Sequence, residues 1–325
     1  MFKITKVEKM NTRNIFFLIS IIFAISCEND KKDMNETMAP IAKKVPKELI
    51  VHNDVRVDNY YWLNNKEDQE VINYLKDENS YYESLTTHTK DFEEELFLEM
   101  KGRIKEDDSS VPYKKNGYWY VTRFEKGKEY PIFSRHKDTL EAPEEIMFNG
   151  NEMAKGHEYF KIGGISISPD NSLAVFSVDT ISRRQYTLKI KNLITGEIYQ
   201  DIIEDTTGAA VWANDNKTIF YTKKDSVTLR SDKVYRHKFT TNAVDDILIF
   251  QEEDDTFGAG VFKTKSKKYI VIISYSTLTT EMRILNADTP EEEFTIFSPR
   301  VRGLEYSISH YNDCFYVLTN RVYLF

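Results

Sequence analysis

The sequence from Lys101 to Phe133 reads KGRIKEDDSSVPYKKNGYWYVTRFEKGKEYPIF and separates two kinds of pattern. Apolar residues before it recur at helical spacing, whereas the residues after it form short apolar runs divided by turn residues. Asn116-Gly117 predicts a two-residue hairpin, because both residue types tolerate the positive φ of a type I′ turn. Val111-Pro112 predicts extended backbone just before that hairpin, since proline disfavours helical geometry in the preceding residue. We therefore expect a domain boundary here, followed by the first hairpin of an all-β domain.

The composition indicates a folded protein with no nucleic-acid partner. Hydrophobic residues make up 41% of the 325 positions and aromatic residues 13%, which is enough to build cores and excludes global disorder. The net charge is −8 with acidic and basic residues interspersed, whereas phosphate binding requires a basic face. The two cysteines, Cys27 and Cys314, offer neither a disulfide framework nor a metal cluster.

The N-terminus predicts export. A lysine-containing stretch is followed by an apolar run from Ile15 to Ile25, the pattern of a signal peptide, and the run ends Ala24-Ile25-Ser26-Cys27. This ending resembles a bacterial lipobox, so we expect a signal peptide at 1–27 and lipidation of Cys27. The protein would then be a membrane-anchored lipoprotein of the periplasm or outer membrane. The alternatives are an ordinary signal peptide or uncleaved anchor, or a cytoplasmic protein if the segment does not function as a signal. Translation could also start at Met10, which would leave a shorter and more typical charged region before the apolar run.

Residues 28–46 are polar with two prolines and predict a flexible tether, and residues 47–107 predict an extended and helical arm. Within the arm, apolar spacing predicts helices over 67–88 and 91–104, the first with Asp68 as its N-cap. The cluster Tyr60-Tyr61-Trp62-Leu63 has no clear periodicity, and we expect it to dock on another part of the protein. The two helices cannot bury their apolar faces against each other alone and need a further surface.

The remainder, 108–325, contains a repeating unit. Turn signals recur about every fifty residues, each followed by apolar strands, and four strands per unit at this period are the signature of a β-propeller. We expect about four blades between Val111 and Pro299 and a fifth that begins at Arg302, which is a truncated propeller. The turn signals are Asn116-Gly117, Asp170-Asn171, Asp215-Asn216, Lys267-Lys268 and Asn312-Asp313.

Several stretches resemble the N-terminal region of the prolyl oligopeptidase family, in its oligopeptidase B (protease II) branch. They are Arg56-Val-Asp-Asn-Tyr-Tyr-Trp-Leu63, Lys101-Gly-Arg-Ile-Lys105, Asp107-Asp-Ser-Ser-Val-Pro112, Gly117-Tyr-Trp-Tyr120, Lys128-Glu-Tyr-Pro131 and Val211-Trp-Ala-Asn-Asp-Asn216. The resemblance implies a propeller of seven blades that caps a C-terminal α/β-hydrolase domain, which this chain lacks, and a 47–107 arm that packs on that domain. It also implies a serine peptidase that cleaves short basic peptides after Lys or Arg.

The chain itself offers little chemistry. A hydrolase needs a nucleophile elbow of the type G-x-S-x-G, and none occurs. The nearest match, Gly163-Gly164-Ile165-Ser166, lies in a predicted strand, so we assign no catalytic residue and expect the chain alone to be inactive. The family's Ser/Asp/His triad would lie beyond Phe325. No cofactor or metal is expected, because the histidines show no metal-ligand spacing; they are His52, His88, His136, His157, His237 and His310.

Two further expectations concern polar segments. Glu106 to Ser110 predicts a hinge between arm and propeller, because its side chains make few packing demands. The acidic run from Glu252 to Asp255 predicts a solvated loop between blades rather than a cation site. The alternative to a peptidase portion is a non-catalytic β-propeller lipoprotein that binds a protein or glycan partner. A split or frameshifted gene is a third possibility.

Overall fold

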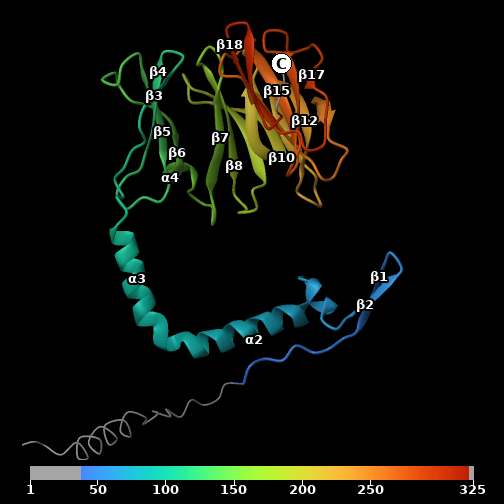
Figure 1. The fold of residues 1–325 in the computed structure, drawn as a ribbon. Helices are drawn as coiled ribbons and strands as arrows, with labels where there is room; N and C mark the ends of the chain where they lie inside the picture. The colour runs from blue at the N-terminus through green and yellow to red at the C-terminus, as the bar shows by residue number, and fades with distance from the viewer. Residues whose placement is uncertain (1–37, 322–325) are drawn as a thin grey trace, which may run out of the picture. The chain divides into compact units, whose positions relative to one another are not determined.

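The computed structural model describes residues 38–321. They divide into two compact units that meet between Ile104 and Lys105 (Figure 1). The first unit contains a hairpin and two helices, and the second consists almost entirely of strands.

The first unit begins with the antiparallel pair β1 (Lys47–Val51) and β2 (Asp54–Asp58). After the short 3-10 helix η1 (Tyr61–Asn64) come α2 (Gln69–Thr86), the single turn η2 (Thr87–Thr89) and α3 (Lys90–Gly102). The Asp68 carboxylate accepts a hydrogen bond of 2.9 Å from the Glu70 amide, which satisfies one of the free donors at the start of α2. The predicted N-cap is confirmed.

Trp62 of the aromatic cluster docks on α2, as expected for apolar surface outside a periodic element. The Trp62 ring meets the Tyr74 ring edge-on, with centroids 6.1 Å apart. The Trp62 indole N–H donates to the Lys43 carbonyl at 3.0 Å, so the segment before β1 is attached to the same place. The Lys43 ammonium lies over the Trp62 ring.

The helices of the first unit leave their apolar faces uncovered within that unit. Val71 is the only buried residue of α2, and α3 has none. The sequence predicted that these faces need a further surface, and the first unit does not provide one. The exposed side chains are Leu75, Tyr82, Leu85, Phe92, Leu96, Phe97 and Met100.

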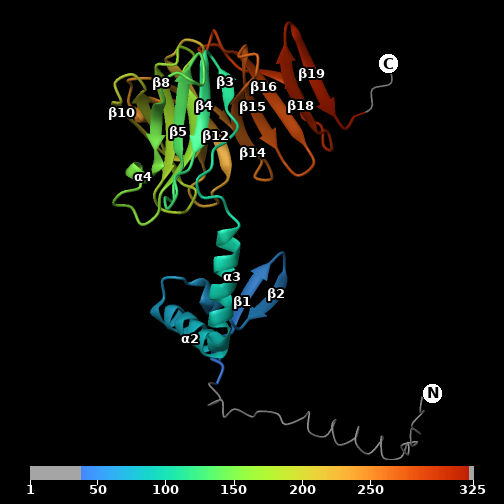
Figure 2. The same cartoon turned by 90° about the vertical axis from the view of Figure 1, so that its left-hand side faces the viewer.

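The second unit is built from successive antiparallel blades (Figure 2). Blade 1 contains β3 (Tyr113–Lys115), β4 (Tyr118–Arg123), β5 (Ile132–Lys137) and β6 (Glu145–Asn149), and the one-turn helix α4 (Gly150–Met153) follows it. Blade 4 contains β14 (Gly258–Lys263), β15 (Tyr269–Tyr275), β16 (Thr280–Asn286) and β17 (Thr295–Ser298). The pair β18 (Tyr306–Tyr311) and β19 (Cys314–Thr319) begins the fifth blade, so the predicted propeller is confirmed.

Blades 2 and 3 share one seven-stranded sheet because a single strand belongs to both. That strand, β10 (Ile198–Trp212), pairs with β9 up to Thr206 and with β11 from Thr206 to Trp212, with a register shift before Ala210. Gly208, at φ 87°, lies in this bend. The other strands are β7 (Lys161–Ile167), β8 (Leu173–Asp179), β9 (Tyr186–Asn192), β11 (Thr218–Lys224), β12 (Ser231–Lys238) and β13 (Ile247–Gln251), with the 3-10 turn η3 (Ala243–Asp245) before the last.

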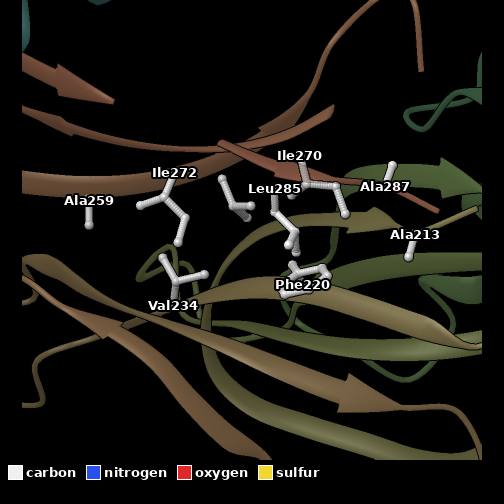
Figure 3. Packing of buried hydrophobic residues seen from close by; sticks show 9 residues of the cluster. Ala213, Phe220, Val234, Ala259, Ile270, Ile272, Leu285 and Ala287 are labelled. Atoms are coloured by element: carbon white, nitrogen blue, oxygen red, sulfur yellow. The ribbon is translucent and has the colours of Figure 1, made fainter. Parts of the chain in front are cut away.

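The cores lie between blades, and the second strand of each inner blade serves two of them. Alternate side chains of a strand point to opposite faces. On β8, Val175 packs toward blade 3 and Phe176 toward blade 1. On β15, Ile270 and Ile272 meet blade 3, where Phe220 is fully buried (Figure 3). This explains why β8, with the sequence LAVFSVD, is buried at all seven positions and does not alternate between apolar and polar residues.

The turns of the blades differ in backbone conformation. Among the five predicted blade turns, Asn116-Gly117 has positive φ at both residues, as predicted, whereas in the later turns a single residue does, for example Asn171 or Asn216. Those turns fit a type I turn followed by one left-handed residue rather than type I′. The segment expected to be a loose hinge also hydrogen-bonds along β4. The Phe124 amide donates to the Asp108 carbonyl and the Ser110 amide to the Thr122 carbonyl, both at 2.8 Å.

Candidate functional site

The first strands of the blades form the inner side of a propeller and face its axis. Here they are β3, β7, the second half of β10, β14 and β18. Because every blade repeats the same up-and-down strand order, the turns between first and second strands gather at one end of the axis. We call this end the turn mouth and define it by residues 115–117, 168–172, 213–217 and 263–268. The opposite end carries the connections from one blade to the next.

Neighbouring turns of the turn mouth are joined by hydrogen bonds. The Asn171 side-chain amide of blade 2 donates to the Asn116 carbonyl of blade 1 at 3.1 Å. The Asp170 amide donates at 2.9 Å to the side-chain oxygen of Asn216 in blade 3. These hydrogen bonds connect the turns of blades 1, 2 and 3 into a rim.

Two further contacts join blade 3 to blade 4 and then blade 4 back to blade 1. The Asn214 side-chain amide of blade 3 donates to the Lys267 carbonyl of blade 4 at 3.1 Å. The Lys267 ammonium in turn donates to the side-chain oxygen of Asn116 in blade 1. The turns of blades 1 to 4 therefore link into a closed chain of contacts around this mouth.

At the opposite end, the acidic run lies in the connection between blades 3 and 4, as predicted, and three of its four residues are exposed; Glu252 is the exception. Glu252 is buried, and Arg300 of the blade 4 to blade 5 connection binds it with two hydrogen bonds of 3.2 and 2.5 Å. Burial alone would raise the pKa of Glu252, but the hydrogen bonds from Arg300 and the Asp254 amide, the nearby Ser274 hydroxyl and the charge of Arg300 together outweigh it and the pKa is lowered. Glu253 to Asp255 remain exposed. The guanidinium of Arg300 also stacks on the Phe257 ring, 3.9 Å from its centroid.

The sequence nearest to a nucleophile elbow has a structural explanation. Gly163 to Ser166 lie within β7, as predicted, and not in the strand-to-helix turn that exposes a nucleophilic serine. A Cβ on Gly164 would lie 2.4 Å from the Gly208 carbonyl, so glycine here permits β7 to approach the bend of β10.

The histidines form no metal site in the described part of the chain. No group of three His, Cys, Asp or Glu side chains between residues 38 and 321 could hold a metal ion. His52, His88 and His157 are exposed, while His136 binds the Ala142 carbonyl at 2.7 Å. His310 lies 2.9 Å from the Ser266 hydroxyl and is buried.

His237 is the histidine whose surroundings the sequence did not reveal. It is fully buried, with Nδ1 2.7 Å from an Asp246 oxygen and Nε2 3.2 Å from an Asp201 oxygen. Asp201 lies on the blade 2 half of β10, so this cluster joins two blades. A spacing of 36 residues between His237 and Asp201 carries no local signal that could have predicted it.

The predicted lipidation site, Cys27, lies outside the described residues. Within residues 38–321, no helix combines the length and the hydrophobicity required to cross a membrane.

Comparison with known proteins agrees with this architecture. Residues 40–324 match the family model described as "Prolyl oligopeptidase, N-terminal beta-propeller domain". The chain is 37% identical over 301 residues to dipeptidyl aminopeptidase BI of Pseudoxanthomonas mexicana, covering 87% of this chain and 42% of the relative. It is 32% identical over 288 residues to Protease 2 of Moraxella lacunata, covering 86% and 42%.

Solved structures lead to the same assignment. Oligopeptidase B from Leishmania major superposes with a TM-score of 0.80 at 28% identity, over 87% of this chain and 43% of that chain. Oligopeptidase B from Trypanosoma brucei, with covalently bound antipain in a closed form, gives 0.78 at 27% identity and the same coverage. The chain thus spans about two fifths of the length of these relatives. It belongs to the prolyl oligopeptidase family, in the oligopeptidase B branch, and comprises the N-terminal β-propeller part of such a peptidase.

Proposed function

We propose that this chain is the substrate-gating portion of an oligopeptidase B-like serine peptidase that cleaves short peptides after Lys or Arg. The observation that carries the proposal is the turn mouth, where four successive blades connect through Asn116, Asn171, Asn214 and Lys267. A mouth whose turns are joined in this way admits no folded protein. A propeller that covers a catalytic domain in this way limits substrates to short peptides and keeps water from the reaction.

The hydrolytic residues would come from an α/β-hydrolase domain that receives the uncovered faces of α2 and α3. The purified 325-residue chain should therefore not hydrolyse chromogenic peptides that end in Arg or Lys. Activity that a serine-directed inhibitor abolishes would contradict this expectation. A G-x-S-x-G coding region directly after the Phe325 codon would support the proposal, and its absence would favour a binding module instead.

The gating role can be tested with a chimera in which residues 38–321 replace the corresponding part of Moraxella lacunata Protease 2. Substituting Lys267→Ala should relax the size limit, so that the chimera cleaves longer Arg-containing peptides relative to a dipeptide substrate. Lys265→Ala is the matched control, because Lys265 lies in the same turn and is exposed. An unchanged length profile in Lys267→Ala would contradict gating at this mouth. Substrates with free and blocked amino ends distinguish an oligopeptidase from a dipeptidyl aminopeptidase.

We further propose that the protein is exported and anchored through a lipid on Cys27. The support is the order of a charged stretch, an apolar run and small residues before this cysteine. Cells that express the chain should incorporate labelled palmitate into it, and Cys27→Ser should abolish the label. Equal labelling of Cys27→Ser would disprove lipidation at this residue, with Cys314→Ser as the control.

A further inference from the structure

Three lysines gather at the turn mouth from two blades that are not sequence neighbours. Lys115 ends β3 in blade 1, whereas Lys263 ends β14 in blade 4 and Lys267 lies in the turn that follows. The hydrogen bond from the Lys267 ammonium to the side chain of Asn116 brings the blade 4 turn to the residue next to Lys115. The rim contacts therefore hold Lys267 beside Asn116, the residue that follows Lys115.

Within residues 38–321, the three ammonium groups have no ion-pair partner. Among the described residues, no carboxylate lies within salt-bridge distance of Lys115, Lys263 or Lys267. Lys263 donates to two neutral acceptors, the Trp212 carbonyl at 2.8 Å and the Asn214 side-chain oxygen at 2.5 Å. The neighbouring Lys268 differs, because it pairs with Asp313 at 3.3 Å.

These cations repel one another. Burial, followed by the charges of Lys115 and Lys267, lowers the pKa of Lys263 to about 8, and Asp288 and Asp215 offset this only in part. Partial desolvation of its ammonium group, followed by the charge of Lys267, also lowers the pKa of Lys115, although this residue is exposed at the surface. In a protein of net charge −8, a group of cations that Asp288 and Asp215 compensate only in part is a costly local arrangement that a bound anion would relieve.

We propose that Lys115, Lys263 and Lys267 bind a multivalent oxyanion of the phosphate class at the turn mouth. An ammonium group is a compact point charge with three donors, which suits a small, highly charged oxygen ligand. Lys263 keeps one N–H beyond its two bonds, and Lys115 makes no side-chain hydrogen bond within the described residues that would have to break. Occupancy would connect blades 1 and 4 through the ligand.

Pyrophosphate is the probe that tests this site. Binding to the 325-residue chain would be measured by titration calorimetry, and the thermal unfolding midpoint with and without pyrophosphate, with sodium chloride keeping the ionic strength constant. We expect binding that raises the midpoint, and a dissociation constant about tenfold weaker in Lys115→Met, because one charge-assisted contact is lost. Without pyrophosphate, Lys115→Met should melt no lower than the parent, since it removes repulsion.

Lys265→Met is the matched control, since this exposed lysine in the same turn is not one of the three. Its affinity should stay within about twofold of the parent, as expected for a screened surface charge. Lys263→Met provides a second variant that should also weaken binding. The proposal is overturned if the parent does not bind millimolar pyrophosphate, or if Lys265→Met weakens binding as much as Lys115→Met does.

Discussion

His237 carries a buried charge that joins blades 2 and 3. Each ring nitrogen faces a carboxylate oxygen, of Asp246 and of Asp201, so both nitrogens donate and the ring is an imidazolium. The Asp201 carboxylate also accepts a 2.6 Å hydrogen bond from the Thr240 amide, and Asp246 accepts one of 2.8 Å from the Tyr221 hydroxyl. Burial alone would lower the pKa of His237, but Asp246 and then Asp201 outweigh it and raise the pKa above 6.5.

This raised pKa predicts a pH dependence of stability. The contribution of His237 is complete below pH 6.5, its ordinary value, and is lost as the pH rises through the higher folded value. The free energy of unfolding should therefore fall toward alkaline pH. Urea denaturation at pH values from about 6 to about 9, a range that includes the ordinary pKa of histidine, measures this change.

Substituting His237→Gln should cost about 3–5 kcal/mol near neutral pH, because two buried carboxylates lose their cation. The variant should also lose most of the alkaline dependence. His310→Gln is the control, since His310 is also buried, but its Nδ1 faces the Ser266 hydroxyl and its ring packs on Tyr269 and Phe315. The same alkaline slope in parent and His237→Gln would show that other groups cause it.

Among the elements, the contact of β7 with β10 leaves no space for an added Cβ at Gly164. Backbone meets backbone at Gly164 and Gly208, so an added methyl group cannot be accommodated by rotating a side chain. We expect Gly164→Ala to destabilise the second unit by about 1–3 kcal/mol, the usual cost of overpacking. Chemical denaturation followed by tryptophan fluorescence measures this, because Trp212 lies beside this contact and is buried.

Gly102→Ala is the corresponding control. No atom lies within 4 Å of a Cβ at Gly102, and this residue ends α3. It should leave the second unit unchanged. A Gly164→Ala variant as stable as Gly102→Ala would mean that β7 and β10 can separate without cost.

The elements also show what sequence patterns could and could not predict. Asn116-Gly117 and the Asp68 cap were predictable because the conformation of each depends on its own residue type. The continuity of β10 was not, because Gly208 reads as a break between strands while pairing with both neighbours keeps the strand intact. The burial of Glu252 depends on Arg300, 48 residues later, and no local pattern records such a partner.

On the scale of the molecule, the two units differ in how much of their apolar surface they bury. The second unit buries its apolar side chains between blades, whereas Phe92 and Phe97 on α3 remain 59% and 53% exposed. Contiguous exposed apolar side chains mark a binding surface or promote aggregation. We expect the double variant Phe92→Ser, Phe97→Ser to remain monomeric at higher concentration than the parent in light scattering.

The unfolding midpoint of the second unit should not change in that double variant. Phe220→Ser serves as the contrast, because Phe220 is fully buried between blades 3 and 4 and its loss should cost about 3–5 kcal/mol. If the double variant aggregates as readily as the parent, the α3 face is not the surface that drives association.

The strand β10 has a consequence for how the propeller acquires its structure. Blades joined by loops can open one at a time, but blades 2 and 3 share the backbone of Ile198–Trp212 and cannot separate without breaking hydrogen bonds to β9 and β11 together. In native-state hydrogen exchange, the amides of β8 to β12 should therefore behave as one foldon, with a common opening free energy and a common denaturant slope. Such a two-blade unit is a natural nucleus on which the flanking blades can assemble.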